Sequence, residues 1–434
     1  MPEQPDVLRR TYRQPETIPY LVTHQPQTRE WPRVHKQLVT FNAGSSTVKI
    51  GTFTFDGQHI RKRARGEIDL NESPVTFRLR GESGNLDIAL ASADAGNIVS
   101  ILEELFARLS DHISPGNILG VGHRVVFGGD QFAGSVLLDD KHIEAIESLS
   151  IYAPLHQPKS TALIKAVRKL LPHLPQAASF DTAFHQTIPD KVRRFAVPIA
   201  LHERGIKRYG FHGLSYKSII ANFSGREPKL AGGKIVAAHL GSGASLCAMD
   251  GGKSVDTSMS FSTLDGIPMA TRCGTIDPGV LLHLLQQENM QADALSDLLY
   301  HRSGLLGLSG ISSDTRDLLA SDDARAREAI DIFTARIAGE ICRLAATLGG
   351  LDALIFTAGI GEHQPAIREA VCERLSWLGF EIDAAANENN AFRITRPTSP
   401  AAAFVLATDE EQIIAAETLD ALRNTAVTAP AASA

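Results

Sequence analysis

The stretch Gln37-Leu-Val-Thr-Phe-Asn-Ala-Gly-Ser-Ser-Thr-Val-Lys-Ile-Gly-Thr-Phe53 has the sequence pattern of a β-hairpin with a polar tip. Its first half carries the β-formers Leu38, Val39 and Phe41, which lead into a run of small turn residues. Residues 49–55 have the pattern of a returning strand. The stretch therefore predicts a strand, a tight turn and an antiparallel strand near the start of the folded chain.

The tip of this hairpin suits an anion. Gly44 permits a tight turn, in which consecutive backbone N–H groups can point into one concavity. The polar side chains around the turn are Asn42, Ser45, Thr47 and Lys49. The Gly-x-x-x-x-Gly-Lys spacing of a P-loop is absent, so the tip alone fits a phosphate site or an ordinary Gly/Ser turn equally well.

A second stretch repeats this pattern in the other half of the chain. Gly233-Lys-Ile-Val-Ala-Ala-His-Leu-Gly-Ser-Gly-Ala-Ser-Leu-Cys-Ala-Met249 again runs from an apolar strand through a Gly/Ser tip into an apolar strand. Two hairpins of the phosphate-binding type in separate halves predict a duplicated domain, with a nucleotide held between the two copies.

Strands and helices alternate along the rest of the chain. Apolar residues recur at helical spacing in residues 97–113 and 323–348, whereas residues 177–181 and 351–356 have the pattern of short buried strands. Such an order predicts α/β layers whose ligands gather at strand ends. Thr408, with Glu411 three residues later, has the pattern of a capping box that opens a final helix.

Length and composition favour a soluble globular protein of two domains. The chain has 434 residues, 43% of them hydrophobic and 21% charged, which suits two globular domains with substantial cores. Its net charge of −6 argues against a nucleic-acid partner bound by phosphate neutralisation. Anionic substrates must then be bound by a few locally placed cations.

Cysteine usage and hydropathy favour a cytoplasmic protein. The four cysteines lie far apart without a Cys-x-x-Cys pair, so neither a metal cluster nor a disulfide framework is predicted: Cys247, Cys273, Cys342 and Cys372. No apolar run reaches the ~18 residues that span a bilayer, and no signal peptide is apparent. Residues 1–36 are expected to be a flexible extension, and residues 425–434 a frayed tail.

Several motifs together resemble the acetate kinases. Phe41-Asn-Ala-Gly-Ser-Ser-Thr-Val-Lys49 is similar to the first signature of that family, and residues 256–266 with 269–274 are similar to the second. Further matching motifs occur in the family's order: Gly122-His-Arg-Val-Val126, Ala153-Pro-Leu-His156, Phe180-Asp-Thr-Ala-Phe-His-Gln-Thr187, Arg208-Tyr-Gly-Phe-His-Gly213, Phe356-Thr-Ala-Gly-Ile-Gly-Glu362 and Thr408-Asp-Glu-Glu411. The resemblance extends from about Gln37 to the end of the chain.

This resemblance implies the fold of the acetate and sugar kinase, heat-shock chaperone and actin superfamily. Two duplicated actin-like (ribonuclease H-like) domains, with mixed sheets flanked by helices, would enclose a nucleotide cleft. Domain I would be residues 37–184 completed by the helix 411–424, and domain II would be residues 185–410. The family also implies a homodimer formed through the second domain.

The resemblance also implies the catalytic groups. Asn42 and Glu410 match the family's magnesium site, for which Mn²⁺ is an alternative occupant. The catalytic positions are Arg124, Asp181, His212 and Arg272. A carboxylic acid is already ionised at neutral pH and needs no general base, so a positioning role suits the aspartate better than proton abstraction.

Two sets of binding residues follow from the same resemblance. The acid substrate would contact Arg124, Val126, Leu155, His156, Phe211 and Thr263. The nucleotide would contact Ser45, Thr47, Lys49, His239, Leu240, Gly241, Ser242, Gly243, Asp314, Thr315, Arg316, Gly359, Ile360, Gly361, Glu362 and His363. Thr263 replaces the family's usual proline, and Ser242 and His363 replace asparagines, so acid and donor preference are open.

The implied activity is the reversible, Mg²⁺-dependent transfer of the γ-phosphoryl group of ATP to acetate, giving acetyl phosphate and ADP. Propionate or another short carboxylate is an alternative acceptor, and pyrophosphate is an alternative donor. A non-catalytic actin-like protein is the remaining alternative, but such a protein has no use for Arg124, His212 and Arg272 around one small pocket.

Overall fold

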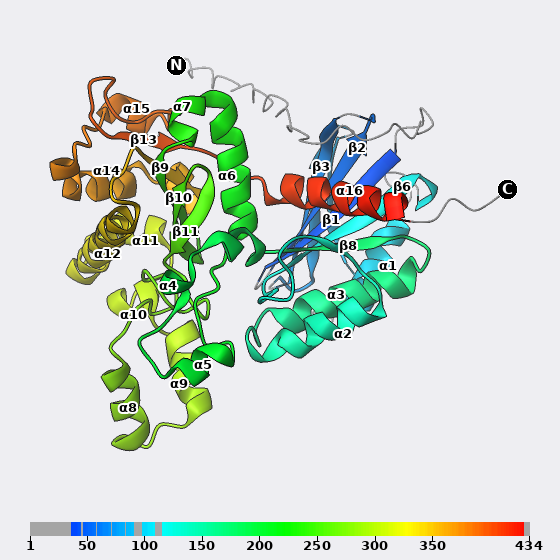
Figure 1. Ribbon diagram of the computed structural model, residues 1–434, viewed down its shortest axis with the longest axis horizontal. Coiled ribbons are helices and arrows are strands. Elements are labelled where there is room, and N and C mark those ends of the chain that lie inside the picture. The colour runs from blue at the N-terminus through cyan, green and yellow to red at the C-terminus, as the bar shows by residue number, and fades with distance from the viewer. Residues whose placement is uncertain are drawn as a thin grey trace, which may run out of the picture.

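A computed structural model describes residues 36–44, 47–57, 59–70, 72–82, 84–90, 98–108 and 115–428, with side chains described as far as residue 424. The strands of these residues form one eight-stranded and one five-stranded sheet. Figure 1 shows the two sheets in separate halves of the molecule, each flanked by helices, with α16 (Glu410–Thr428) running into the half that holds the N-terminal strands.

The first sheet has the strand order β5-β4-β3-β2-β1-β6-β8-β7. Its strands are β1 (Lys36–Ala43), β2 (Thr47–Phe55), β3 (Ile60–Asp69), β4 (Thr76–Gly81), β5 (Gly84–Ala89), β6 (Ile118–Val125), β7 (Val136–Leu137) and β8 (Gln176–Phe180). β1 pairs with β2 in antiparallel and with β6 in parallel orientation, so the sheet is mixed. The predicted hairpin is present, with Asn42 opposite Lys49.

Alternation along β1 gives this sheet two buried faces. Val39 and Phe41 pack in one cluster with α1 (Ile98–Arg108) and α3 (Gln157–Leu170), beside α2 (Asp140–Ser148). Leu38 points to the other face and packs with Ala415 and Leu419 of α16. Successive side chains of a strand point to opposite faces, so β1 needs a helical cover on each side.

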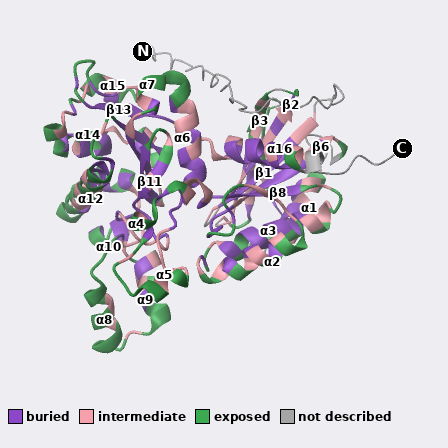
Figure 2. Cartoon of the chain, in the orientation of Figure 1, coloured by how far each residue is buried: buried purple, intermediate pink, exposed green. Residues whose placement is uncertain are grey.

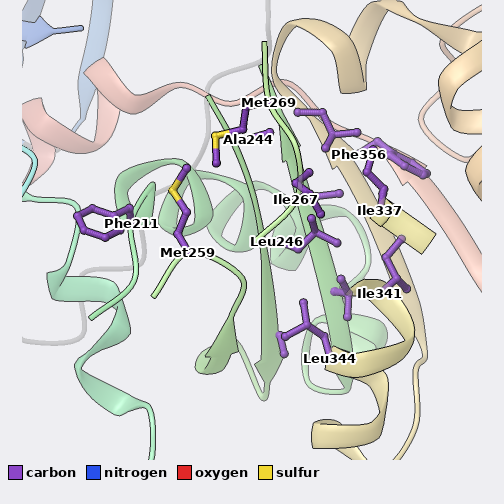
Figure 3. Close-up of a cluster of buried hydrophobic side chains, with 14 of the residues drawn as sticks. Phe211, Ala244, Leu246, Met259, Ile267, Met269, Ile337, Ile341, Leu344 and Phe356 are labelled. Atoms are coloured by element: carbon purple, nitrogen blue, oxygen red, sulfur yellow. The ribbon is translucent and has the colours of Figure 1, made fainter. Parts of the chain in front are cut away.

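The second sheet has the order β11-β10-β9-β12-β13. Its strands are β9 (Lys234–Leu240), β10 (Ala244–Asp250), β11 (Lys253–Thr257), β12 (Ala353–Thr357) and β13 (Ala402–Val405). On one face, Ile337, Ile341 and Leu344 of α12 (Ala324–Leu348) pack toward Leu246 and Phe356, as Figure 3 shows. On the other face α6 (Gly213–Arg226) contributes buried aromatic side chains.

The two sheets repeat one arrangement. β1 is antiparallel to β2 and parallel to β6, and β9 is likewise antiparallel to β10 and parallel to β12. The predicted duplicated α/β architecture with mixed sheets is thus confirmed. The exact domain limits expected near residues 184 and 410 stay a prediction.

Short helices connect these layers. They are α4 (Asp190–Arg193), α5 (Ile199–Glu203), α7 (Pro228–Ala231), α8 (Pro278–Gln286), α9 (Ala292–His301), α10 (Gly304–Ser309), α11 (Thr315–Leu319), α13 (Ala358–His363), α14 (Pro365–Arg374) and α15 (Ala384–Glu388), with 3₁₀ turns at Pro115–Asn117, Leu149–Ile151, Ala183–Thr187 and Ser376–Leu378. Figure 2 shows most of the strand core buried and α8 largely exposed. Across the described residues, no helix has both the length and the apolarity to cross a membrane.

The predicted capping box at Thr408 is wrong. Asp409 caps α16 instead, because its Oδ1 accepts a hydrogen bond from the backbone N–H of Gln412 at 3.0 Å. The Oγ1 atom of Thr408 is buried without a hydrogen-bond partner in the described part of the chain. Oδ1 of Asp409 also accepts a hydrogen bond from Nζ of Lys62 at 2.5 Å. This contact joins distant segments, so a local pattern cannot reveal it.

Two predicted segments lie partly outside the described residues. The amphipathic helix expected over residues 97–113 is α1, described from Ile98 to Arg108. Of the extension expected at residues 1–36, only Lys36 is described, where β1 begins. At the other end the backbone of α16 continues to Thr428, into the segment expected to be a frayed tail.

Candidate active site

A cavity of about 570 Å³ lies between the two sheets. Its lining comes from both hairpins, the ends of β6 and β8, the start of α6, the loop before α8, α13 and the start of α16. The lining residues are Asn42, Gly44, Thr47, Lys49, Arg65, Arg124, Val126, His156, Asp181, Phe211, His212, His239, Gly241, Ser242, Gly243, Thr263, Arg272, Ala358, Gly359, Glu362, His363, Ala407, Thr408, Glu410 and Glu411. Most of the predicted site residues are therefore brought together.

A larger cavity of about 870 Å³ shares the loop around Arg272 but opens elsewhere, between that loop and α12. Two of its arginines are engaged, since Arg343 pairs with Asp256 at 2.6 Å and Arg208 lies 3.8 Å from the same carboxylate. None of the predicted catalytic residues lines it. We therefore take the smaller cavity as the candidate active site.

Arg124 and Asp181 form a buried ion pair at the ends of adjacent strands. β6 and β8 are parallel and in register, so the end of β6 lies beside the residue that follows β8. The guanidinium donates to the carboxylate through Nε at 3.0 Å and Nη2 at 2.6 Å. Burial raises the pKa of Asp181, and the positive charge of Arg124 opposes that rise. Although burial alone would lower the pKa of Arg124, the carboxylates of Asp181 and Glu410 raise it.

Asn42 links this pair to the start of α16. Its Oδ1 accepts a hydrogen bond from Nη1 of Arg124 at 3.2 Å, and its Nδ2 donates to Oε2 of Glu410 at 2.8 Å. Nδ2 also lies 3.1 Å from Oε1 of Glu411, which sequence reasoning did not place in the site. Burial opposes ionisation of Glu410, but Arg124 chiefly and His239 next lower its pKa, so this group is a carboxylate at neutral pH.

These groups fit a hard divalent cation. Amide and carboxylate oxygens, such as those of Asn42 and Glu410, are the donors that Mg²⁺ prefers, although Asn42 turns its Nδ2 and not its Oδ1 toward Glu410 in this structure. Within the described residues, no three His, Cys, Asp or Glu side chains converge as a complete metal cage. A metal held here would therefore take its remaining ligands from water and from substrate phosphate, as Mg²⁺ in phosphoryl-transfer sites does.

His212 occupies a constrained position at the N-cap of α6, with a φ angle of 58°. Its Nδ1 lies 2.8 Å from Oγ of Ser245, which in turn lies 2.6 Å from the hydroxyl of Tyr216. The ring stacks on His239 with centroids 4.3 Å apart. Burial first, and then the neighbouring His239 and Arg124, hold the pKa of His212 well below its usual value, so the ring is neutral.

The glycines of the second hairpin give backbone access to this ring and to Arg272. A Cβ on Gly243 would lie 3.6 Å from Nε2 of His212 and 3.5 Å from Nη1 of Arg272. Arg272 itself donates to the carbonyl of Thr263 at 3.2 Å, and no carboxylate of the described residues lies within 4.0 Å of it. An anion beside Gly243 would therefore meet an unpaired guanidinium and an imidazole.

Three side chains form an apolar end of the cavity. Val126, Phe211 and Thr263 are 3%, 1% and 8% exposed and line the cavity together with His156. Burial, and then Arg272, lower the pKa of His156 to about 3, so this imidazole is also neutral. Leu155 does not join them: it is 39% exposed, because the turn closed by His156 N–H to Ala153 O directs it outward.

The predicted nucleotide residues are only partly brought together. The cavity lining includes Thr47, Lys49, His239, Gly241, Ser242, Gly243, Gly359, Glu362 and His363. It does not include Leu240, Ile360, Gly361, Asp314, Thr315 or Arg316. Asp314 caps α11 and pairs with Arg316 at 2.5 Å. Ser45 lies outside the described residues.

Sequence reasoning missed several lining residues. These are Gly44, Arg65, Ala358, Ala407, Thr408 and Glu411. Ala358 has a φ angle of 65°, and its N–H donates to Glu362 at 2.9 Å, which fixes the start of α13. The basic run over residues 61–65 was the one local sign of Arg65, and it is equally typical of an exposed strand edge.

The duplicated fold and the cation-lined cleft between its halves define a phosphotransferase of the actin-like class. The model of the acetokinase family matches residues 37–416. This chain belongs to the acetokinase family.

Individual relatives agree with this assignment. The acetate kinase of Rhodopseudomonas palustris is 43% identical over 387 residues, which cover 87% of this chain and 96% of the relative. A propionate kinase structure from Francisella tularensis superposes with a TM-score of 0.82 at 34% identity, covering 89% of this chain and 99% of the other. An acetate kinase structure from Porphyromonas gingivalis gives 0.79 at 34% identity, covering 89% and 100%.

Proposed function

We propose that this protein catalyses the reversible, Mg²⁺-dependent transfer of the γ-phosphoryl group of ATP to acetate. One observation carries the proposal: Arg124 from the first sheet and Arg272 from the second-sheet half line one small cavity whose end is apolar. A short carboxylate presents a charged end and an apolar end, and a phosphoryl donor adds further negative charge. The cavity offers partners for each.

The two arginines take different roles. Nε and Nη2 of Arg124 are held by Asp181, and Nη1 contacts Asn42, so this guanidinium is fixed in orientation before substrate arrives. Arg272 has no carboxylate partner within the described residues and is free to neutralise charge on the moving phosphoryl group. Asp181 orients Arg124 and abstracts no proton, because an acetic-type acid with a pKa of ~4 is already ionised.

Neutral His212 acts as a hydrogen-bond donor toward the phosphoryl oxygens. If Tyr216 donates to Ser245 and Ser245 donates to Nδ1 of His212, the proton of the neutral ring is on Nε2. Nε2 is the atom that lies beside Gly243. A preorganised donor of this kind stabilises the charge that develops in transfer without taking up a proton.

Asn42 and Glu410 would hold Mg²⁺, with Mn²⁺ as an alternative. A bound divalent ion would neutralise the donor phosphates and orient them for in-line transfer. Because Oδ1 of Asn42 accepts a hydrogen bond from Arg124 while Nδ2 faces Glu410, the amide would have to turn to present its oxygen to the metal. The glycine-rich segments at 241–243 and 359–363 would receive the nucleotide from the second-sheet side.

Propionate is the second candidate acceptor. Thr263 lies at the apolar end of the cavity and carries a hydroxyl beside its methyl group. One methylene changes the selectivity of such a pocket between acids by only ~1–3 kcal/mol.

We also propose a homodimer formed through the second-sheet half. Val280, Leu282 and Leu285 of α8 are 42%, 53% and 37% exposed, an apolar surface that a second copy would cover.

An acyl phosphate assay tests the function directly. Purified protein is incubated with Mg-ATP and acetate, propionate or butyrate, and acyl phosphate is trapped with hydroxylamine. Acetate should give the highest kcat/KM, and Arg124→Ala should lose the product. Absence of product with every acid would overturn the proposal, while product from pyrophosphate in place of ATP would change the donor.

A further inference from the structure

Among the described residues, three cations line the cleft without a carboxylate partner of their own. Lys49, Arg65 and Arg272 make no ion pair within 4.0 Å among the described residues, whereas Arg124 is paired with Asp181. Lysine and arginine side chains in such positions are available to an incoming anion. Arg272 already has a role in the mechanism above and the family resemblance assigns Lys49 to the nucleotide, whereas Arg65 has no assigned role.

Strand register places Arg65 on the same face as Lys49. In the β2–β3 pair, Lys49 lies opposite Glu67 and Gly51 lies opposite Arg65. Residues two apart on a strand point to one face, so Lys49 and Arg65 both point to the side on which Asn42, opposite Lys49, meets α16. Arg65 therefore faces the cleft from the strand next to the phosphate hairpin.

Neither residue directly opposite Arg65 in the sheet is acidic, and Glu67, two residues along β3 on the same face, forms no ion pair with it within 4.0 Å. Opposite it on β2 is Gly51, where a Cβ would meet the Phe53 ring at 2.5 Å, so no side chain is tolerated there. Opposite it on β4 is Arg80, which is itself paired with Asp87. Like charges directly across a sheet destabilise it, so this arrangement calls for an anion from outside the sheet.

We propose that Arg65 binds the terminal phosphate of the phosphoryl donor, beside Lys49 and across the cleft from Gly241–Gly243. The ligand class is a polyphosphate chain, and the inference rests on the proposed phosphoryl transfer. Glu410 and Glu411 bring negative charge to the same wall of the cleft. The positive charge of Arg65 would reduce the repulsion between these carboxylates and a bound phosphate. It would not contact the acid bound at the apolar end.

Kinetics of Arg65→Gln and Arg63→Gln test the proposal. Arg63 is the matched control, since it lies two residues away on β3 and is paired with Glu82 at 2.5 Å outside the cavity lining. Arg65→Gln should raise KM for Mg-ATP about tenfold, the size of one charged hydrogen bond, and leave KM for acetate within about twofold. Arg63→Gln should change neither, and Arg65→Lys should restore part of the loss.

Nucleotide affinity separates this inference from the proposed function. Mg-ATP binding to the full-length variants is measured by calorimetry without acetate, at low and high salt, because an exposed charge contact weakens as salt rises. A loss confined to Arg65→Gln, with an unfolding midpoint no lower than that of the native protein, supports the role. Equal nucleotide affinity for the two glutamine variants, or an equal rise in KM for acetate, would overturn it. Wild-type protein that binds Mg-ATP but forms no acyl phosphate would instead defeat the proposed function.

Discussion

Asn42 on the first strand and Glu410 at the start of the last helix are 368 residues apart in the chain and joined by a 2.8 Å hydrogen bond. The same amide side chain accepts a hydrogen bond from Arg124, which is held by Asp181. The candidate metal site and the candidate acid site are thus two ends of one buried network. That network is complete only when α16 packs on the first sheet.

Removing the charge of Glu410 should weaken metal binding. Glu410→Gln keeps the side-chain size but loses the carboxylate, and we expect the Mg²⁺ concentration needed for half-maximal activity to rise at least about tenfold. Glu417→Gln is the control, because Glu417 lies on the same helix and pairs with Lys217 away from the cavity lining. A similar Mg²⁺ dependence for both variants would argue against a metal at Glu410.

Breaking the Arg124–Asp181 pair should cost stability as well as activity. Arg124→Ala leaves a buried carboxylate unpaired, which typically costs about 3–5 kcal/mol of unfolding free energy. The double variant Arg124→Ala/Asp181→Ala should recover part of that loss, since no unpaired charge remains. Urea unfolding of the two single variants and the double variant gives the interaction free energy between the two residues. Strictly additive losses of unfolding free energy would contradict the prediction.

Thr263 should set the preference between short acids. Thr263→Val replaces a hydroxyl by a methyl group of nearly equal size at the apolar end of the cavity, so kcat/KM for propionate relative to acetate should rise by up to about tenfold. Thr263→Ser, which keeps the hydroxyl and loses the methyl, is the matched comparison. An unchanged ratio in Thr263→Val would remove Thr263 from the acyl pocket.

Buried histidines should make the fold sensitive to acid. Burial lowers the pKa of His123, His185 and His239 to about 4 in the folded state, against about 6.5 in an unfolded chain. Between pH 6.5 and about 4 the unfolded state binds more protons, so the unfolding free energy falls as pH falls through this window. Urea midpoints measured across this pH window should show the slope. The His185→Gln variant should have a shallower slope, reduced by the contribution of about one proton.

Asp409 and Thr408 should differ sharply as caps of α16. Asp409→Ala removes the hydrogen bond to Gln412 N–H and the Lys62 ion pair, and we expect a loss of about 1–2 kcal/mol. Thr408→Ala removes a buried hydroxyl without a partner among the described residues, so stability should be unchanged or slightly raised. Thermal unfolding of both variants checks this. A larger loss of stability in Thr408→Ala than in Asp409→Ala would show that Thr408 caps the helix after all.

The acceptor and nucleotide sides differed in how far they could be predicted. Arg124, His212 and Arg272 were predicted because each lies in a motif that matches a known family, and the structure brings all three to one cavity. Leu155 was expected there by the same match but points outward, since the direction of a turn side chain depends on how the turn closes. Asp314 and Arg316 pair with each other outside the cavity lining.

The sequence by itself determined the local elements, because hairpins and amphipathic helices follow from apolar spacing and turn residues within a short window. It also determined the duplication, since the two glycine-rich hairpins are visible as repeated patterns. Only the tertiary structure decided which distant groups meet. Arg65 faces the cleft through strand register, and Glu411 reaches Asn42 through the crossing of α16. The Glu411 contact joins segments 369 residues apart, and no local pattern encodes packing of that kind.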